Sequence, residues 1–203
     1  MIINPLCELQ QNIIPAIAAN IRPNLYVELG VRGCETINKV APFCTKAIAV
    51  DVIQFKHLIA CPNIEEKIMT TDEYAKICIE RIDMLFIDAD HHYEQVKKDF
   101  WNFEKFVIPQ GLIFLHDTMP EGVIELEQSS LDAYKFAEEI RRDKEFLDNF
   151  EIITIPTNPG LSIIRKTTTQ LKTSIEDIYR IHMKDPYIRE FLEKKRKNPE
   201  INL

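Results

Sequence analysis

The stretch Met84-Leu-Phe-Ile-Asp-Ala-Asp-His-His-Tyr93 decides the fold, because an apolar run ends abruptly in two carboxylates and two imidazoles. Residues 84–87 are hydrophobic on both faces of an extended chain, which is typical of a central strand in a parallel sheet. The titratable side chains that follow should emerge together at the carboxyl edge of this strand: Asp88, Asp90, His91 and His92. Ligands bind at this edge in open α/β sheets, so the stretch predicts a functional site.

The composition is that of an ordinary globular domain. Of the 203 residues, 45% are hydrophobic and 28% are charged, which suits one domain with a sizeable core. The first residues carry no basic segment, and no apolar run approaches the roughly 18 residues of a membrane span, so we expect a soluble, cytoplasmic protein without a membrane partner. The net charge of -7 argues against a surface that coats nucleic acid. Five cysteines without a Cys-x-x-Cys pair predict reduced thiols, with neither a disulfide framework nor a structural zinc site.

Apolar runs and helical periodicities alternate along the first part of the chain. Strands are predicted at 25–29, 47–50, 66–70, 84–87 and 112–115, and helices at 5–20, 35–43 and 93–107. This alternation indicates a doubly wound, mostly parallel α/β sheet with right-handed crossovers and helices on both faces.

The C-terminal part has a different pattern. A polar connection at 119–130 is long enough to form a lid, and a helix is predicted at 131–148. Runs at 151–156 and 161–165 flank Thr-Asn-Pro-Gly, a turn signal that predicts a closing hairpin with an antiparallel strand. We therefore expect a domain at 1–166 and a helical C-terminal extension at 167–203.

The loop Val27-Glu-Leu-Gly-Val-Arg-Gly33 stands where a doubly wound fold places its first ligand loop. A dinucleotide loop needs Gly-x-Gly-x-x-Gly, but Arg32 stands where the second glycine belongs. Glu28, two residues before Gly30, would repel phosphate and favour an ammonium or sulfonium group. Asp51 ends the next strand at the spacing of an acid that accepts both hydroxyls of a ribose. The combination favours a cationic adenosyl amino acid over a dinucleotide.

Four segments resemble the class I S-adenosylmethionine-dependent methyltransferases: Glu28–Gly33, Asp51, Phe86–Tyr93 and Gly111–Thr118. The likeness is closest to small-molecule O-methyltransferases, in which an Ile-Asp-(Gly/Ala)-Asp-His strand end precedes a Gly-Gly-x-Ile-x-x-His-Asp-Thr strand. It covers 25–118, and the hairpin at 151–165 fits the last strands of that family. The resemblance implies a Rossmann-like, seven-stranded sheet and S-adenosyl-L-methionine as cofactor.

The same resemblance implies roles for individual residues. The methionine moiety would lie against Glu28, Gly30 and Gly33, the ribose against Asp51, the adenine against Thr71 or Asp72, and the transferred methyl near Asp88. In metal-dependent relatives, acids at the positions of Asp88 and Asp117 hold a divalent ion such as magnesium, and the position of His91 is often a catalytic lysine. Two departures stand out. The glycine pair of the loop is spaced Gly-x-x-Gly, where the family more often has Gly-x-Gly-x-Gly or Gly-x-x-x-Gly. The metal set is also incomplete, since Thr118 replaces an asparagine and Gln110 replaces the first of two glycines.

Methyl transfer to a hydroxyl is an in-line displacement that also requires loss of the hydroxyl proton. We expect His91 to act as the base together with Asp88, with His92 and His116 as alternatives, or a divalent ion at Asp88 and Asp117. Asp90 is better interpreted as the N-cap of the helix that follows. The expected function is transfer of a methyl group to a hydroxyl of a small molecule, such as a sugar or a secondary metabolite.

Three alternatives remain open at this point. The first is a metal-dependent glycosyltransferase that uses Asp88-Ala-Asp90, and the second is a non-catalytic scaffold that keeps the cofactor site. The third is an oxygenase on the same fold, although its two-histidine ligand set is not evident from the sequence. The expected partner is a small-molecule acceptor, whose identity no motif specifies, and a homo-oligomer is equally open.

Overall fold

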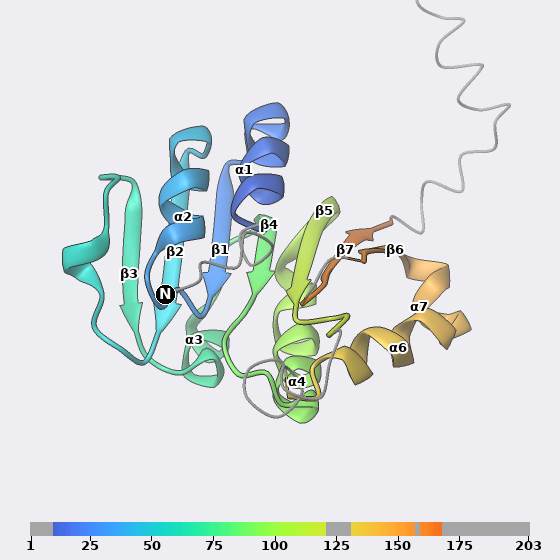
Figure 1. Ribbon diagram of the computed structural model, residues 1–203. Coiled ribbons are helices and arrows are strands. Elements are labelled where there is room, and N and C mark those ends of the chain that lie inside the picture. Colours follow the sequence, from blue (N-terminus) through green and yellow to red (C-terminus); the bar gives the residue numbers. More distant parts are fainter. Residues whose placement is uncertain (1–9, 121–130, 157–158, 168–203) are drawn as a thin grey trace, which may run out of the picture. The chain divides into compact units, whose positions relative to one another are not determined.

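The computed structural model describes residues 10–120, 131–156 and 159–167. Its strands form one seven-stranded sheet in the order β3-β2-β1-β4-β5-β7-β6 (Figure 1). The strands are β1 (Leu25–Leu29), β2 (Lys46–Asp51), β3 (Ile64–Ile68), β4 (Ile82–Ile87), β5 (Val107–His116), β6 (Phe150–Ile155) and β7 (Leu161–Lys166). The pairs among β3, β2, β1, β4 and β5 are parallel, whereas β7 is antiparallel to both β5 and β6. The predicted Rossmann-like sheet with its closing hairpin is confirmed.

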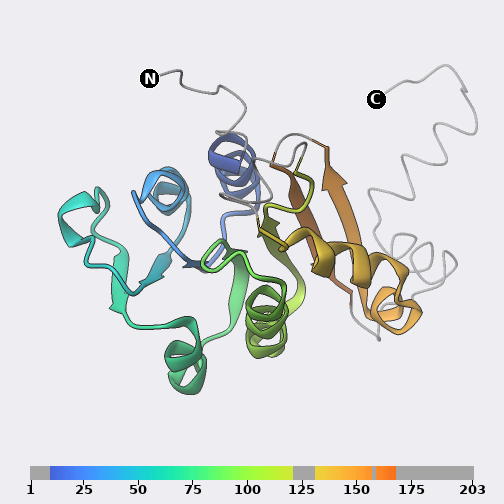
Figure 2. The same ribbon diagram turned by 60° about the horizontal axis from the view of Figure 1, so that its bottom comes forward.

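Helices cover both faces of this sheet (Figure 2). One face carries α1 (Gln10–Ile21) and α2 (Glu35–Val40), which pack through Ile14, Ala18, Ile37 and Val40. The other face carries α3 (Thr71–Ile77), α4 (Tyr93–Phe103), α6 (Tyr134–Arg142) and α7 (Lys144–Asn149). Short 3-10 helices are η1 (Ala41–Phe43), η2 (Lys56–Leu58) and η3 (Glu104–Phe106).

Phe100 of α4 lies at the centre of the hydrophobic core on the face of the sheet that carries α3, α4, α6 and α7. Its ring lies 5.3 Å from that of Phe136, 5.7 Å from Phe146 and 5.6 Å from Phe150, so three later elements pack on one side chain. Phe100 is fully buried, and such a side chain contributes roughly 1.5–3 kcal/mol through removal from water. This cluster holds α4, which follows the acidic strand end, against α6, α7 and β6.

Backbone hydrogen bonds hold the carboxyl ends of neighbouring strands at one level. The Gly30 amide donates to the Val50 carbonyl at 2.8 Å, and the Asp88 amide donates to the Leu29 carbonyl at 2.8 Å. The residues that follow β1, β2 and β4 are therefore adjacent at a single edge, where the sequence predicted the site.

Several predicted boundaries are wrong. β3 begins at Ile64, two residues before the predicted strand, and Val107 opens β5 where it was expected to close the preceding helix. The single helix predicted at 131–148 is two helices, because the Asp143 carboxylate accepts hydrogen bonds from the amides of Glu145 and Phe146 and starts α7. Three predicted segments lie mostly or partly outside the described residues: 121–130 of the lid predicted at 119–130, 5–9 of the first helix, and 168–203 of the extension predicted at 167–203.

Candidate active site

A cavity of about 1000 Å³ runs along the carboxyl edge of the sheet. Residues that follow five different strands line it, as expected of the ligand site of a doubly wound fold. It brings together most of the predicted site residues: Glu28, Gly30, Asp51, Thr71, Asp72, Asp88, His91, His116 and Asp117. Gly33 and His92 are not among its lining residues.

Two carboxylates and two imidazoles meet at one end of this cavity. Asp117 Oδ2 lies 2.8 Å from His91 Nδ1, and Asp88 Oδ1 lies 2.8 Å from His116 Nδ1. The crossed contacts, His91 Nε2 to Asp88 and His116 Nδ1 to Asp117, are each 3.4 Å. The ends of β4 and β5 thus form a single four-membered cluster.

The cluster holds its charges in a defined state. Burial alone would lower the pKa of His116, but the negative charges of Asp88 and Asp117 beside its ring raise the pKa to about 10. Burial would raise the pKa of Asp117, yet hydrogen bonds with His116 and His91 hold it well below its usual range. The pKa of Asp88 is likewise lowered against its burial by His116 and His91. At neutral pH His116 is therefore an imidazolium between two carboxylates.

Glu28 is a buried carboxyl group with one hydrogen bond. Its side chain is 2% exposed, and the Tyr26 hydroxyl donates to Oε2 at 2.6 Å. Burial raises the pKa of Glu28 well above its usual value, and the nearby charge of Asp88 adds to the effect, although the Tyr26 hydrogen bond opposes it. A cationic group in the cavity would stabilise the charged form of Glu28, which supports the preference for an ammonium or sulfonium ligand.

Gly30 and Asp51 shape the loop between β1 and α2. Gly30 has a φ of +83°, and a Cβ atom there would lie 2.2 Å from the Asp88 carbonyl oxygen, so only glycine fits. The Asp51 carboxylate accepts hydrogen bonds from the amides of Val31, Arg32 and Ile53 at 3.0–3.1 Å. Asp51 therefore ties the loop to β2 while it also lines the cavity.

Residues 47–118 match the model of a family described as a methyltransferase domain. This segment begins in β2 and contains Asp51, Asp88, His91 and Asp117, which carry much of the site. Over these residues the chain is similar to a methyltransferase domain. No curated protein matches the chain.

Solved structures of methyltransferases share the fold of this chain at low sequence identity. The O-methyltransferase TomG from Streptomyces achromogenes, solved with S-adenosylmethionine, is 12% identical with a TM-score of 0.60; the alignment covers 78% of this chain and 80% of TomG. An O-methyltransferase from Bacillus cereus, solved with S-adenosylhomocysteine, is 15% identical with a TM-score of 0.58 and coverages of 78% and 80%. The N-methyltransferase NodS from Bradyrhizobium japonicum is 12% identical with a TM-score of 0.58, covering 83% of this chain and all of NodS. The fold thus serves both oxygen and nitrogen acceptors, and it does not favour the glycosyltransferase alternative.

The four-membered cluster at the carboxyl ends of β4 and β5 also fits a divalent ion. One ligand atom from each of Asp88, His91, His116 and Asp117 lies within 4.8 Å of the others. Both ring nitrogens of His116 are buried, and neither makes a hydrogen bond of ordinary geometry with a described residue, although Nδ1 lies 2.8 Å from Asp88 Oδ1. The sequence predicted only the two acids as ligands. The structure adds the imidazoles of His91 and His116 to these acids. Two histidines beside carboxylates are the ligand set that the oxygenase alternative requires and that the sequence did not reveal.

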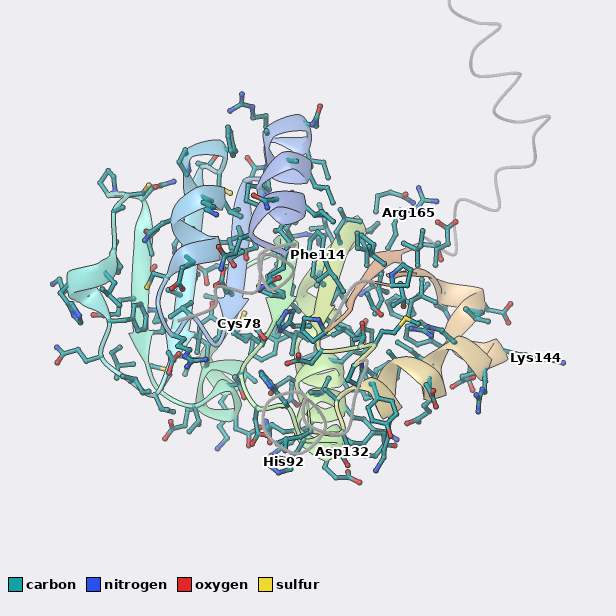
Figure 3. All side chains as sticks on the ribbon, in the orientation of Figure 1. Cys78, His92, Phe114, Asp132, Lys144 and Arg165 are labelled. Carbon is teal, nitrogen blue, oxygen red and sulfur yellow. The ribbon has the colours of Figure 1, made fainter. Side chains whose placement is uncertain are left out.

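Asp90 and His92 lie beside this cluster without joining it. Asp90 Oδ1 accepts a hydrogen bond from the His92 amide at 2.9 Å, whereas the first helical amide, that of Tyr93, donates to Asp132 Oδ1 at 2.7 Å. Figure 3 shows Asp132 next to His92 at the start of α4. The prediction that Asp90 caps the helix is therefore wrong: His92 is the N-cap residue and a distant aspartate satisfies the helix.

Sequence reasoning missed the glutamines of the site. Gln10 and Gln11 of α1 and Gln95 of α4 all line the cavity. Gln95 stands in the first turn of the helix that follows the acidic strand end, and this position in the sequence could have indicated that it lines the site.

The described part of the chain contains no helix that is long and apolar enough to cross a membrane.

Proposed function

We propose that the methyltransferase domain binds S-adenosyl-L-methionine and transfers its methyl group to a hydroxyl of a small molecule, such as a sugar or a secondary metabolite. One observation carries this proposal: Glu28 and Asp51 line the same cavity as the cluster of His91 and Asp117. A volume of about 1000 Å³ is at the upper end for a small-molecule site, so cofactor and acceptor can occupy it together.

The parts of the cofactor would lie along the carboxyl ends of β1, β2 and β4. The buried Glu28 carboxylate would face the cationic amino acid portion, and Asp51 would accept the ribose hydroxyls from the neighbouring strand. Asp88, whose amide is bonded to the end of β1, would then lie beside the transferred methyl group. TomG and the Bacillus cereus enzyme bind S-adenosylmethionine and S-adenosylhomocysteine on the same fold, which supports this cofactor.

His91 is the base that best fits the geometry. Its Nδ1 atom lies 2.8 Å from Asp117, which would hold the tautomer with the proton on Nδ1, and its Nε2 atom, 3.4 Å from Asp88 Oδ1, would take the acceptor's proton beside a carboxylate that stabilises the resulting positive charge. In the reaction the acceptor oxygen bonds to the methyl carbon as the carbon–sulfur bond breaks. The hydroxyl proton passes to His91 Nε2, and S-adenosylhomocysteine leaves as a neutral thioether. His116 fits this role less well, because its pKa of about 10 keeps it protonated.

A divalent ion would be held by Asp88 and Asp117, with His91 or His116 completing the set. Bound there, it would lower the pKa of an acceptor hydroxyl. Imidazole together with carboxylate suits manganese, iron or zinc better than magnesium. His116 could join only after losing its proton, so binding would release protons and tighten as the pH rises.

The test is an assay of the full chain with S-adenosylmethionine and a panel of hydroxyl compounds, with S-adenosylhomocysteine and methylated product measured by mass spectrometry. We expect both products in equal amounts, with turnover lost in Asp88→Asn and kept in the neighbouring Asp90→Asn. Chelator and added Mn²⁺ or Mg²⁺ decide whether an ion assists. Cofactor binding without turnover on the panel would favour the scaffold alternative. Oxygen consumption with iron and 2-oxoglutarate, without S-adenosylhomocysteine, would favour the oxygenase.

A further inference from the structure

Gln95 lines the cavity in the first turn of α4, next to Thr71 at the start of α3. The two side chains are joined directly, since Gln95 Nε2 donates to Thr71 Oγ1 at 3.2 Å. The resemblance assigned this region of the cavity, just past β3, to a nucleoside base, but it gave Gln95 no role.

Both hydrogens of the Gln95 amide group are used within the protein. Besides Thr71, Nε2 donates to Asp99 Oδ1 at 2.9 Å, one helical turn further along α4. The amide oxygen accepts no hydrogen bond from any described residue. It is not one of the buried side-chain atoms that lack a partner, so it is open to the cavity. The side chain therefore presents an acceptor, and no donor, to the cavity.

Asp99 fixes this orientation. Its side chain is fully buried, and Oδ2 accepts no hydrogen bond from the described part of the chain. A carboxylate has only acceptors to offer, so rotation of the Gln95 amide would place two oxygens against each other in a buried site. The Thr71 hydroxyl oxygen accepts the other Gln95 hydrogen from α3, so both hydrogens of the amide are held by the protein.

We infer that the Gln95 amide oxygen accepts a hydrogen bond from the exocyclic amino group of an adenine base and so selects adenine over 6-oxopurines. Asp99 is the positioning residue that holds the amide for this contact. A 6-oxopurine presents a carbonyl oxygen at the same place, where it would meet the amide oxygen without a proton between them. The inference rests on the proposed cofactor and deepens it, because it names the group that recognises the base.

The test compares the affinities of S-adenosyl-L-homocysteine and S-inosyl-L-homocysteine, in which a carbonyl oxygen replaces the 6-amino group, by calorimetry on the full chain. We expect the wild type to prefer the adenosyl compound by about tenfold or more, the typical worth of one hydrogen bond and its mismatch. Gln95→Met should weaken the adenosyl compound by about tenfold and bring the ratio of affinities close to one. Glu94→Met, on the exposed side of the same turn, is the matched control and should keep the wild-type ratio.

Asp99→Asn is the second variant, and it carries the test if Gln95→Met fails to fold. An asparagine there can donate to the Gln95 amide oxygen and let the amide turn, so the preference should shrink although Gln95 is present. A merely structural role of Asp99 would change both affinities and leave their ratio unchanged. The inference is overturned if the adenosyl compound binds but the wild type shows no preference, or if Gln95→Met keeps it. If neither compound binds the wild type, the proposed function itself falls.

Discussion

His91 Nδ1 lies 2.8 Å from Asp117 Oδ2, so Asp117 at the end of β5 orients His91 in the segment after β4. This contact leaves His91 Nε2 as the base in our account. We expect His91→Ala to lower kcat roughly 100-fold or more, the usual worth of a positioned general base, with little change in S-adenosylhomocysteine affinity. Steady-state kinetics and calorimetry on the same preparation measure both quantities.

His92→Ala is the natural control for that variant. The side chain of His92 is 66% exposed and contacts Asp90, and His92 itself does not line the cavity. We expect its kcat to remain within about twofold of the wild type, since it touches no reacting atom. Equal losses in both variants would contradict the assignment of the base to His91.

Gly30→Ala should be strongly destabilising, whereas Gly33→Ala should be close to neutral. A Cβ at Gly30 would lie 2.2 Å from the Asp88 backbone and adopt a positive φ, at a cost of about 2 kcal/mol or more. The three atoms nearest to a Cβ at Gly33 all belong to the flexible carboxylate of Glu35, which can move. Urea unfolding of the two variants measures the difference, and similar losses in both would contradict this view of the loop.

Gln110→Gly should stabilise the protein. Gln110 has a φ of +66°, a left-handed conformation that costs a residue with a side chain about 1 kcal/mol relative to glycine. The variant loses an exposed hydrogen bond from Arg165 to the Gln110 side chain, which is worth little in water. Gln110→Ala, which keeps a Cβ and also lacks that bond, separates the two effects. A gain in Gln110→Ala equal to that in Gln110→Gly would exclude backbone strain as the cause.

Asp99 should make the stability of the protein depend on pH. Burial raises the pKa of Asp99 to about 6, above its unfolded value, although hydrogen bonds from Thr71 and Gln95 oppose the rise. An acid whose pKa is raised in the folded state stabilises that state when it is protonated. The contribution of Asp99 to the free energy of unfolding is therefore complete below about pH 4 and is lost as the pH rises through about 6. The unfolding free energy of Asp99→Asn minus that of the wild type should therefore increase by about 3 kcal/mol between about pH 4 and about pH 7.5. Urea unfolding at both pH values tests this, and a constant difference would contradict it.

The sequence predicts those parts of the site that depend on a strand end. Asp88, His91 and Asp117 follow apolar runs, and parallel strands must bring their carboxyl ends to one edge, so their meeting was foreseeable. Contacts made by a distant residue were not. Asp132 satisfies the first amide of α4 from across the chain, and local spacing alone favoured Asp90 as the cap.

The same distinction applies to helices and glutamines. The apolar periodicity of residues 131–148 is continuous and predicts one helix. The break at Asp143 depends on the capping hydrogen bonds of a single side chain, which the periodicity does not show. Gln95 has an ordinary place in an amphipathic helix; its importance comes from Asp99 and Thr71, which fix the direction of its amide. No pattern of residue types reports such a direction.

The most direct test of the account is calorimetry of the wild-type chain with S-adenosylhomocysteine, beside Asp51→Ala and the exposed control Asp148→Ala. We predict one bound molecule per chain for the wild type and Asp148→Ala. The affinity of Asp51→Ala should fall roughly 30-fold or more, because a charged acceptor of the ribose hydroxyls is lost. No binding to the wild type, or equal binding to all three proteins, would contradict the claim that this cavity is a cofactor site.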